Sequence, residues 1–192
     1  MNRRSVIAAM IALLSLSIAA PSRSTDAPGF GDAFWKHWGD GRAELAGYDL
    51  ETPRYGAMRK GTAVAIFVTE TFSNSLRVKA DPGKHPKSDE YPVMKLNLIQ
   101  DFATGIYDYN LMTSAFIAIT PVNSRPAGAA TKVAFSAQEW CGLVFSQLLF
   151  DAKSARYTAH SYFDGEADQA ATLAVPADAV SEDALLCWAR GF

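Results

Sequence analysis

Apolar and polar side chains alternate along most of this chain, and that period of two constrains the fold more than any other feature. In residues 91–98 (YPVMKLNL), one Met and two Leu residues point to one side while Lys and Asn point to the other. This pattern is typical of a β-strand with one buried face. Residues 62–72 (TAVAIFVTETF) are rich in Val, Ile, Phe and Thr, with apolar side chains on both faces of their first half. They predict a central strand.

Three further segments are rich in residues that favour strands, namely 106–119, 132–150 and 154–163. Loops containing Gly, Pro, Asn and Asp separate these segments, and no helical segments alternate with them. A single flat sheet could not hide the hydrophobic residues, which make up 49% of the chain. The sequence therefore predicts a mainly β fold, either a curved antiparallel sheet or a partly closed lipocalin-like β-barrel.

Helical spacing occurs only near the two ends of residues 32–192, which we expect to form a single β-rich domain. Residues 32–38 hold three aromatic side chains at helical spacing, which predicts one turn of helix closing an end of the core. Residues 181–188 begin with Ser at the N-cap position, followed by two acidic residues. This order predicts a short helix docked on the sheet. Because the chain ends without a Gly or Asn cap, the domain could be a shortened version of a longer one.

The first residues have the pattern of a secretory signal peptide. Arg3 and Arg4 precede an uncharged apolar run from residue 6 to residue 20, which is shorter than a transmembrane helix requires. The small residues at the end of this run predict cleavage after Ala19. Residues 1–19 are then the signal peptide, and residues 20–31, rich in Pro, Ser and Gly, form a flexible leader.

The expected compartment follows from this signal and from the cysteines. No cysteine precedes Cys141, so the lipid-modified cysteine of a bacterial lipoprotein cannot form at the start of the mature protein. We therefore expect a soluble periplasmic or secreted protein with no transmembrane segment in the mature chain. Loss of Arg3 and Arg4 would leave 16 basic against 20 acidic residues. That acidic balance argues against nucleic acid as a partner.

The sequence lacks the common catalytic motifs. It has no Gly-x-Ser-x-Gly elbow, no His-Glu-x-x-His, no Walker loop and no Gly-x-Gly-x-x-Gly. The histidines, His37, His85 and His160, are far apart in sequence, and their spacing does not match that of metal ligands. We expect no cofactor, no metal and no catalytic residue that a motif would identify.

Cys141 and Cys187 are the only cysteines, and an exported location permits a disulfide between them. The bond would stabilise the fold by about 3–4 kcal/mol in the chain-entropy model and would fasten the C-terminal helix to the sheet. The alternative is a buried free thiol at Cys141.

Glu139 interrupts an apolar row formed by alternate residues of 133–141. A carboxylate in such a row must be paired, be protonated or face a wet cavity. Arg54 and Lys95 are candidate partners for an ion pair. Gly142 suggests a β-bulge that could instead turn Glu139 outward. The sequence leaves both a structural role and a pocket carboxylate open.

Aromatic residues near Glu139 form the second candidate feature. Tyr107 and Tyr109 share one face of their segment, and Trp140 follows Glu139 directly. Together the four residues could form the wall of a ligand site, although aromatic residues at period two are also ordinary core packing.

The order of several short motifs resembles a family of uncharacterised bacterial exported envelope proteins, some of which carry the label septum formation inhibitor Maf. The resemblance spans most of residues 41–169, and the family's members are longer than this chain. Genuine Maf proteins are cytoplasmic nucleotide pyrophosphatases with an α/β fold, so the label is a poor guide to this chain. The resemblance implies an envelope location and transfers no catalytic residue. The motifs that carry it are GRAEL at 41–45, RYG at 54–56, GTAV at 61–64, FVTE at 67–70, KLN at 95–97, TGIY at 104–107, QEWCG at 138–142 and SYF at 161–163.

Three functional hypotheses follow. The first, which we favour, is non-enzymatic binding of an apolar or amphipathic ligand, or of an envelope partner, in the concavity of the sheet. The second is a periplasmic hydrolase that uses Glu139 with Asp101, Asp108 or His160 as acid and base. The third is a scaffold that pairs its sheet edge with another envelope protein.

Overall fold

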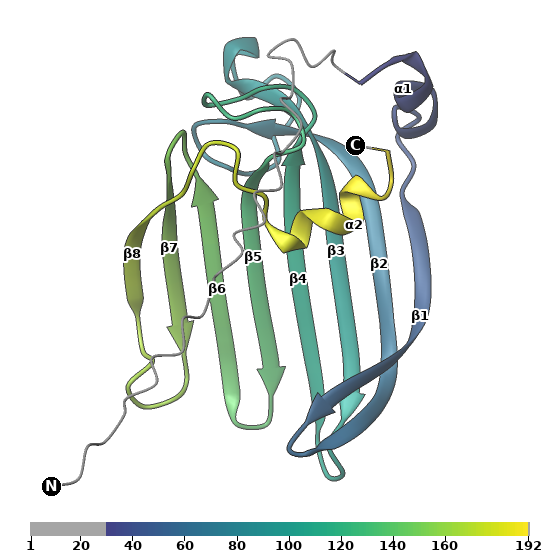
Figure 1. Cartoon of the computed structure of the whole chain (residues 1–192), viewed down its shortest axis with the longest axis vertical. Coiled ribbons are helices and arrows are strands. Elements are labelled where there is room, and N and C mark those ends of the chain that lie inside the picture. The colour runs from purple at the N-terminus through teal and green to yellow at the C-terminus, as the bar shows by residue number, and fades with distance from the viewer. Residues whose placement is uncertain (1–29, 192) are drawn as a thin grey trace, which may run out of the picture.

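Eight β-strands form one antiparallel sheet in which every strand pairs with the next one along the chain (Figure 1). The computed structural model describes residues 30–191, so the predicted signal peptide and most of the leader lie outside the described residues. The sheet is curved. It does not close on itself, since β1 and β8 are its two edges and do not pair with each other. The predicted mainly β, curved antiparallel fold is confirmed. The strands are β1 (Glu44–Arg54), β2 (Ala57–Ser73), β3 (Glu90–Ala103), β4 (Asp108–Ala118), β5 (Ala130–Glu139), β6 (Gly142–Phe150), β7 (Ser154–Ser161) and β8 (Gln169–Ala174).

One face of the sheet, here called the inner face, carries most of the hydrophobic core. The strand register places one row of side chains side by side across β2 to β5, because Phe67 pairs with Leu96, Leu96 with Ala115 and Ala115 with Val133. All four residues are buried and belong to one cluster. The opposite, outer face carries the side chains between them, so the alternation expected for 91–98 is confirmed.

Short helices cover one half of the inner face. Helix α1 (Asp32–Trp38) buries Trp38 at the edge of the core, 6.5 Å from the Phe67 ring between centroids. The 3-10 turn η2 (Glu182–Ala184) and α2 (Leu185–Trp188) lie across the middle of the sheet, in contact with β4 and β3 (Figure 1). A further 3-10 turn, η1 (Lys87–Asp89), lies in the loop before β3. Both predicted terminal helices are therefore present, α1 with Trp38 in the core and the C-terminal helix docked on the sheet.

Hydrogen bonds and an ion pair hold the C-terminal segment in place. Trp188 donates its indole N–H to the carbonyl of Gly128 at 2.8 Å, and Arg190 pairs with Glu44 of β1 at 2.8 Å. Buried Arg125 donates to two carbonyl oxygens in the loop that leads to η2. The segment is thus bound to β1 and to the loop before β5 by contacts between residues far apart in sequence.

The predicted disulfide is wrong, because both cysteines are free. Cys187 is buried in α2, in the same core cluster as Val133, whereas Cys141 is exposed in the turn between β5 and β6. Along β5, the strand from Val133 to Glu139 spans roughly 20 Å at the usual rise per residue. A disulfide needs Cα atoms within about 7 Å. The alternative of a buried thiol at Cys141 is also wrong, since the buried thiol is Cys187.

Among the described residues, no helix has the length and apolar character needed to cross a lipid bilayer. Within the β-favouring run of residues 132–150 lies the hairpin of β5 and β6, and the segment 106–119 holds a single strand, β4.

Candidate ligand-binding site

The tip of the β1–β2 hairpin projects past the rest of the sheet. Tyr55 and Gly56 form a two-residue turn with φ of 53° and 70°, the positive values that a tight type I′ hairpin requires. Pairing between β2 and β3 begins only at Gly61, so residues 57–60 pair with β1 alone. A Cβ atom at Gly61 would collide with the carbonyl oxygen of Asp101. The glycine lets the strands approach closely where the tip crosses the inner face (Figure 1).

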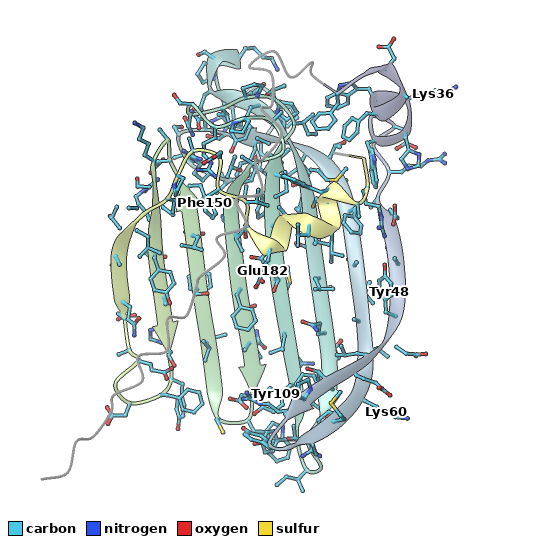
Figure 2. The ribbon with its side chains drawn as sticks, in the orientation of Figure 1. Lys36, Tyr48, Lys60, Tyr109, Phe150 and Glu182 are labelled. Atoms are coloured by element: carbon cyan, nitrogen blue, oxygen red, sulfur yellow. The ribbon has the colours of Figure 1, made fainter. Side chains whose placement is uncertain are left out.

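A pocket of about 310 Å³ lies between this tip and the inner face. Its walls come from five strands and from the loop after β7. Most of its lining is apolar, and the polar residues Arg54 and Glu139 contact Tyr109, which Figure 2 places at the end of the sheet beneath the hairpin. The lining residues are Thr52, Pro53, Arg54, Phe102, Tyr109, Leu111, Phe135, Ala137, Glu139, Val144 and Phe163.

Tyr109 is the centre of the pocket's polar end. It is only 2% exposed and stacks on Phe102, its partner in β3, with ring centroids 5.1 Å apart and planes within 3°. Its phenol oxygen accepts a hydrogen bond from Arg54 at 3.1 Å and lies 2.5 Å from the phenol oxygen of Tyr55. Burial, and next a hydrogen bond with the carboxylate of Glu139, raise the pKa of Tyr109 far above its usual value. The phenol is therefore neutral at physiological pH.

Glu139 faces the pocket, so the structure supports the pocket carboxylate and not an outward rotation. Glu139 pairs with Gly142 across a turn formed by Trp140 and Cys141, and no bulge displaces it. One carboxylate oxygen, Oε2, is buried and accepts no hydrogen bond from the described residues. Neither proposed partner forms an ion pair with it: Lys95 pairs with Glu70 at 3.0 Å, and Arg54 contacts the two tyrosines instead.

The other two predicted site residues flank the pocket without lining it. Tyr107 lies 5.7 Å from the ring of Tyr109 and 5.7 Å from that of Trp140, measured between centroids. Trp140 is 73% exposed at the tip of the β5–β6 hairpin. The structure thus brings all four predicted residues, Tyr107, Tyr109, Glu139 and Trp140, into one region, with two inside the pocket and two at its rim.

The structure does not bring the acid–base partners of the hydrolase hypothesis to Glu139. In the register, Asp101 pairs with Asn110 and Asn110 with Gln138, which places Asp101 on the outer face. Asp108 shares that face. His160 does too, because it pairs with Phe145, and it contacts Asp168 at 2.6 Å. Glu139 points to the other side of the sheet. Within residues 30–191, no three His, Cys, Asp or Glu side chains are grouped so that they could hold a metal ion.

Several pocket residues were not expected from the sequence. Pro53 and Phe102 lie outside the segments expected to form strands, Phe163 is the last residue of the segment 154–163, and Phe135 belongs to the apolar row before Glu139. Arg54 was considered only as a partner of Glu139. The Tyr55-Gly56 pair is the one local signal that could have indicated a hairpin tip here.

Comparison with known proteins found no matching family model, no matching curated protein and no matching solved structure. The resemblance to exported envelope proteins therefore stays a prediction.

Proposed function

We propose that this protein binds a small apolar or amphipathic molecule, without chemical conversion, in the pocket beneath the β1–β2 hairpin. The observation that carries the proposal is the pocket itself: a cavity of about 310 Å³ lined mainly by apolar side chains, in which the polar residues Arg54 and Glu139 contact Tyr109. Apolar walls that carry a few placed polar groups are the usual composition of small-molecule sites. The volume lies at the lower end of their size range.

The absence of an acid–base pair around Glu139 favours binding over hydrolysis. The described carboxylates and histidine that could serve Glu139 lie across the sheet from it. A general acid or base must come within hydrogen-bond reach of the group it serves. The walls around Glu139 instead offer contact area to an apolar body.

The test fills the pocket with a larger side chain. Ala137 lines the pocket, whereas Ala134 lies on the same strand but on the outer face, paired with Ser114 and Gln147. We expect Ala137→Phe to weaken binding of N-phenyl-1-naphthylamine at least tenfold, measured by the fluorescence of that probe. Ala134→Phe, the matched control, leaves its affinity unchanged. Equal affinity of both variants and the parent protein would contradict the proposal.

We also propose that the protein is exported and acts in the periplasm or outside the cell. The support is the sequence of residues 1–19, with its basic start, apolar run and small residues before the cleavage position. Mass spectrometry of protein recovered from a periplasmic extract is expected to find a chain that begins at Ala20. A full-length chain retained in the cytoplasm would contradict this part.

A second candidate function, pairing with an envelope partner, is favoured by one observation. Every residue of β8 is exposed, and this edge strand has neither a charged residue nor a proline. The other edge, β1, carries four charged residues and Pro53, which protect an edge from further pairing. An open edge strand can accept an extended segment of another protein.

Site-specific photo-crosslinking tests this candidate. A photoreactive residue at Thr172 of β8 is expected to capture one defined partner in cells. The same residue at Thr158, which is exposed on the neighbouring strand β7 away from the edge, is expected to capture none. Identical products from both positions, or none from either, would contradict pairing through β8.

A further inference from the structure

We propose that the ligand of this pocket carries an ammonium group, and that Glu139 binds that group while the aromatic walls hold an apolar body. The inference rests on the proposed function and names the chemical class of its ligand. It starts from a buried polar atom of the pocket that the described part of the chain leaves without a hydrogen bond, the Oε2 oxygen of Glu139.

A buried carboxylate oxygen without a donor is costly, because it has lost its water and gained nothing in return. Within residues 30–191 Glu139 forms no ion pair with a lysine, arginine or histidine. A carboxylate only accepts hydrogen bonds when ionised, so the missing partner is a donor. A charged N–H donor satisfies the oxygen and balances its charge at the same time.

Arg54 and Tyr109, two other polar residues of the pocket, are already engaged. Arg54 donates to Tyr109, and its guanidinium lies over the rings of Tyr55 and Tyr109 at 4.7 and 4.8 Å. The phenol of Tyr109 lies 2.5 Å from that of Tyr55. Glu139 has a hydrogen bond with Tyr109, but its buried Oε2 oxygen still has no donor. An anionic ligand would face Glu139 directly.

The walls favour a flat or branched apolar body beside the ammonium group. Phe102, Phe135 and Phe163 line the pocket from β3, β5 and the loop after β7. Aromatic faces attract cations as well as apolar groups. The ligand class is therefore a primary or secondary amine on a small aromatic or aliphatic body.

The experiment compares three probes of similar size on the mature protein by calorimetry: 2-phenylethylamine, the neutral 2-phenylethanol and the anionic 3-phenylpropanoate. We expect the amine to bind on the order of tenfold to a hundredfold more tightly than the alcohol, as a hydrogen bond to a charged group predicts. The propanoate is expected to bind most weakly. Glu139→Gln is expected to abolish the preference for the amine over the alcohol. Glu51→Gln, on the exposed β1 edge, is the matched control and keeps the preference.

The outcomes separate this inference from the proposed function. If the alcohol binds as tightly as the amine, or if Glu139→Gln keeps the preference, the ammonium assignment is wrong while the pocket still binds apolar probes. If the propanoate binds best, Arg54 is the anchor and the assignment is also wrong. If Ala137→Phe leaves probe binding unchanged, the proposed function itself fails.

Discussion

The phenol oxygens of Tyr55 and Tyr109 lie 2.5 Å apart and join the tip of the β1–β2 hairpin to the start of β4. Tyr55 is 60% exposed, whereas Tyr109 is 2% exposed, so the pair connects the surface of the hairpin with the floor of the pocket. Arg54 adds a second hydrogen bond to the same phenol. The phenol oxygen of Tyr109 therefore links the β1–β2 hairpin, which covers the pocket, to β4.

Removal of that oxygen is expected to weaken the attachment of the β1–β2 hairpin to β4. Tyr109→Phe keeps the stacking on Phe102 but removes the hydrogen bonds to Arg54 and Tyr55. We expect the free energy of unfolding to fall by about 1 kcal/mol, the usual net contribution of a hydrogen bond. Urea denaturation followed by circular dichroism measures the change. Tyr162→Phe, at an exposed position, is the control, and an equal loss there would contradict the assignment.

Gly61 is expected to tolerate no side chain. The Cβ of an alanine would collide with the carbonyl oxygen of Asp101 and approach the Cβ of Phe102 to 2.7 Å, so β2 and β3 would have to separate. We expect Gly61→Ala to lower the free energy of unfolding by about 1–3 kcal/mol and to weaken binding of the apolar probe. Gly47→Ala in β1 is the control, because that Cβ meets nothing within 4 Å. Equal thermal stability of both variants would count against a tight approach at Gly61.

The two thiols are expected to differ in reactivity. Burial raises the pKa of Cys187 from 9.0 to about 12, whereas Cys141 is exposed in its turn. At pH 8, Ellman's reagent is expected to modify one thiol in the folded protein and two in guanidinium. Cys141→Ser is expected to remove the fast-reacting thiol, since only the thiolate attacks. Two fast-reacting thiols in the native protein would show that Cys187 is not enclosed in the core.

The loop before β3 is expected to lose its support in acid. Asp89 accepts a hydrogen bond from the Ser73 hydroxyl at 2.6 Å and others from Ser75, and the bond from Ser73 is the main cause that lowers its pKa below 3.8. A lowered pKa means that the ionised form stabilises the fold at pH values above 3.8 and that this contribution disappears as the pH falls through the lower native value.

Asp89→Asn tests this dependence. We expect the variant to be less stable than the parent protein at pH 7, because the amide accepts these hydrogen bonds less strongly. The difference between the two proteins is expected to shrink as the pH falls below 4. Thermal unfolding between pH 2 and pH 7 measures it. A difference that stays constant over this range would show that the charge of Asp89 does not support the loop.

Much of the sheet could be predicted from the sequence, because the alternation of side chains in a strand is a local property. The inner-face positions of Met94, Leu96 and Leu98 were identified correctly from their spacing alone. Strands β1 and β8 were missed because they are edge strands: with one neighbour each, they bury few side chains, and their segments carry little apolar alternation.

The state of the two cysteines, by contrast, could not be predicted from the sequence. Composition and expected compartment made a disulfide between Cys141 and Cys187 reasonable, but neither states how far apart two positions lie in space. Cys141 lies in the turn after β5, at the tip of the β5–β6 hairpin, whereas α2 holds Cys187 in the core cluster. The C-terminal segment is held by apolar packing and by Trp188 and Arg190 instead.

The sequence by itself determined that this chain is built from antiparallel strands and that Glu139 shares a face with the apolar residues before it, since both depend on neighbours two positions apart. Only the tertiary structure decided that Arg54, Tyr109, Glu139 and Phe163 surround one cavity. These residues come together because the β1–β2 hairpin bends over the inner face. Contacts between residues far apart in sequence hold it there, and no short segment of the sequence specifies such contacts.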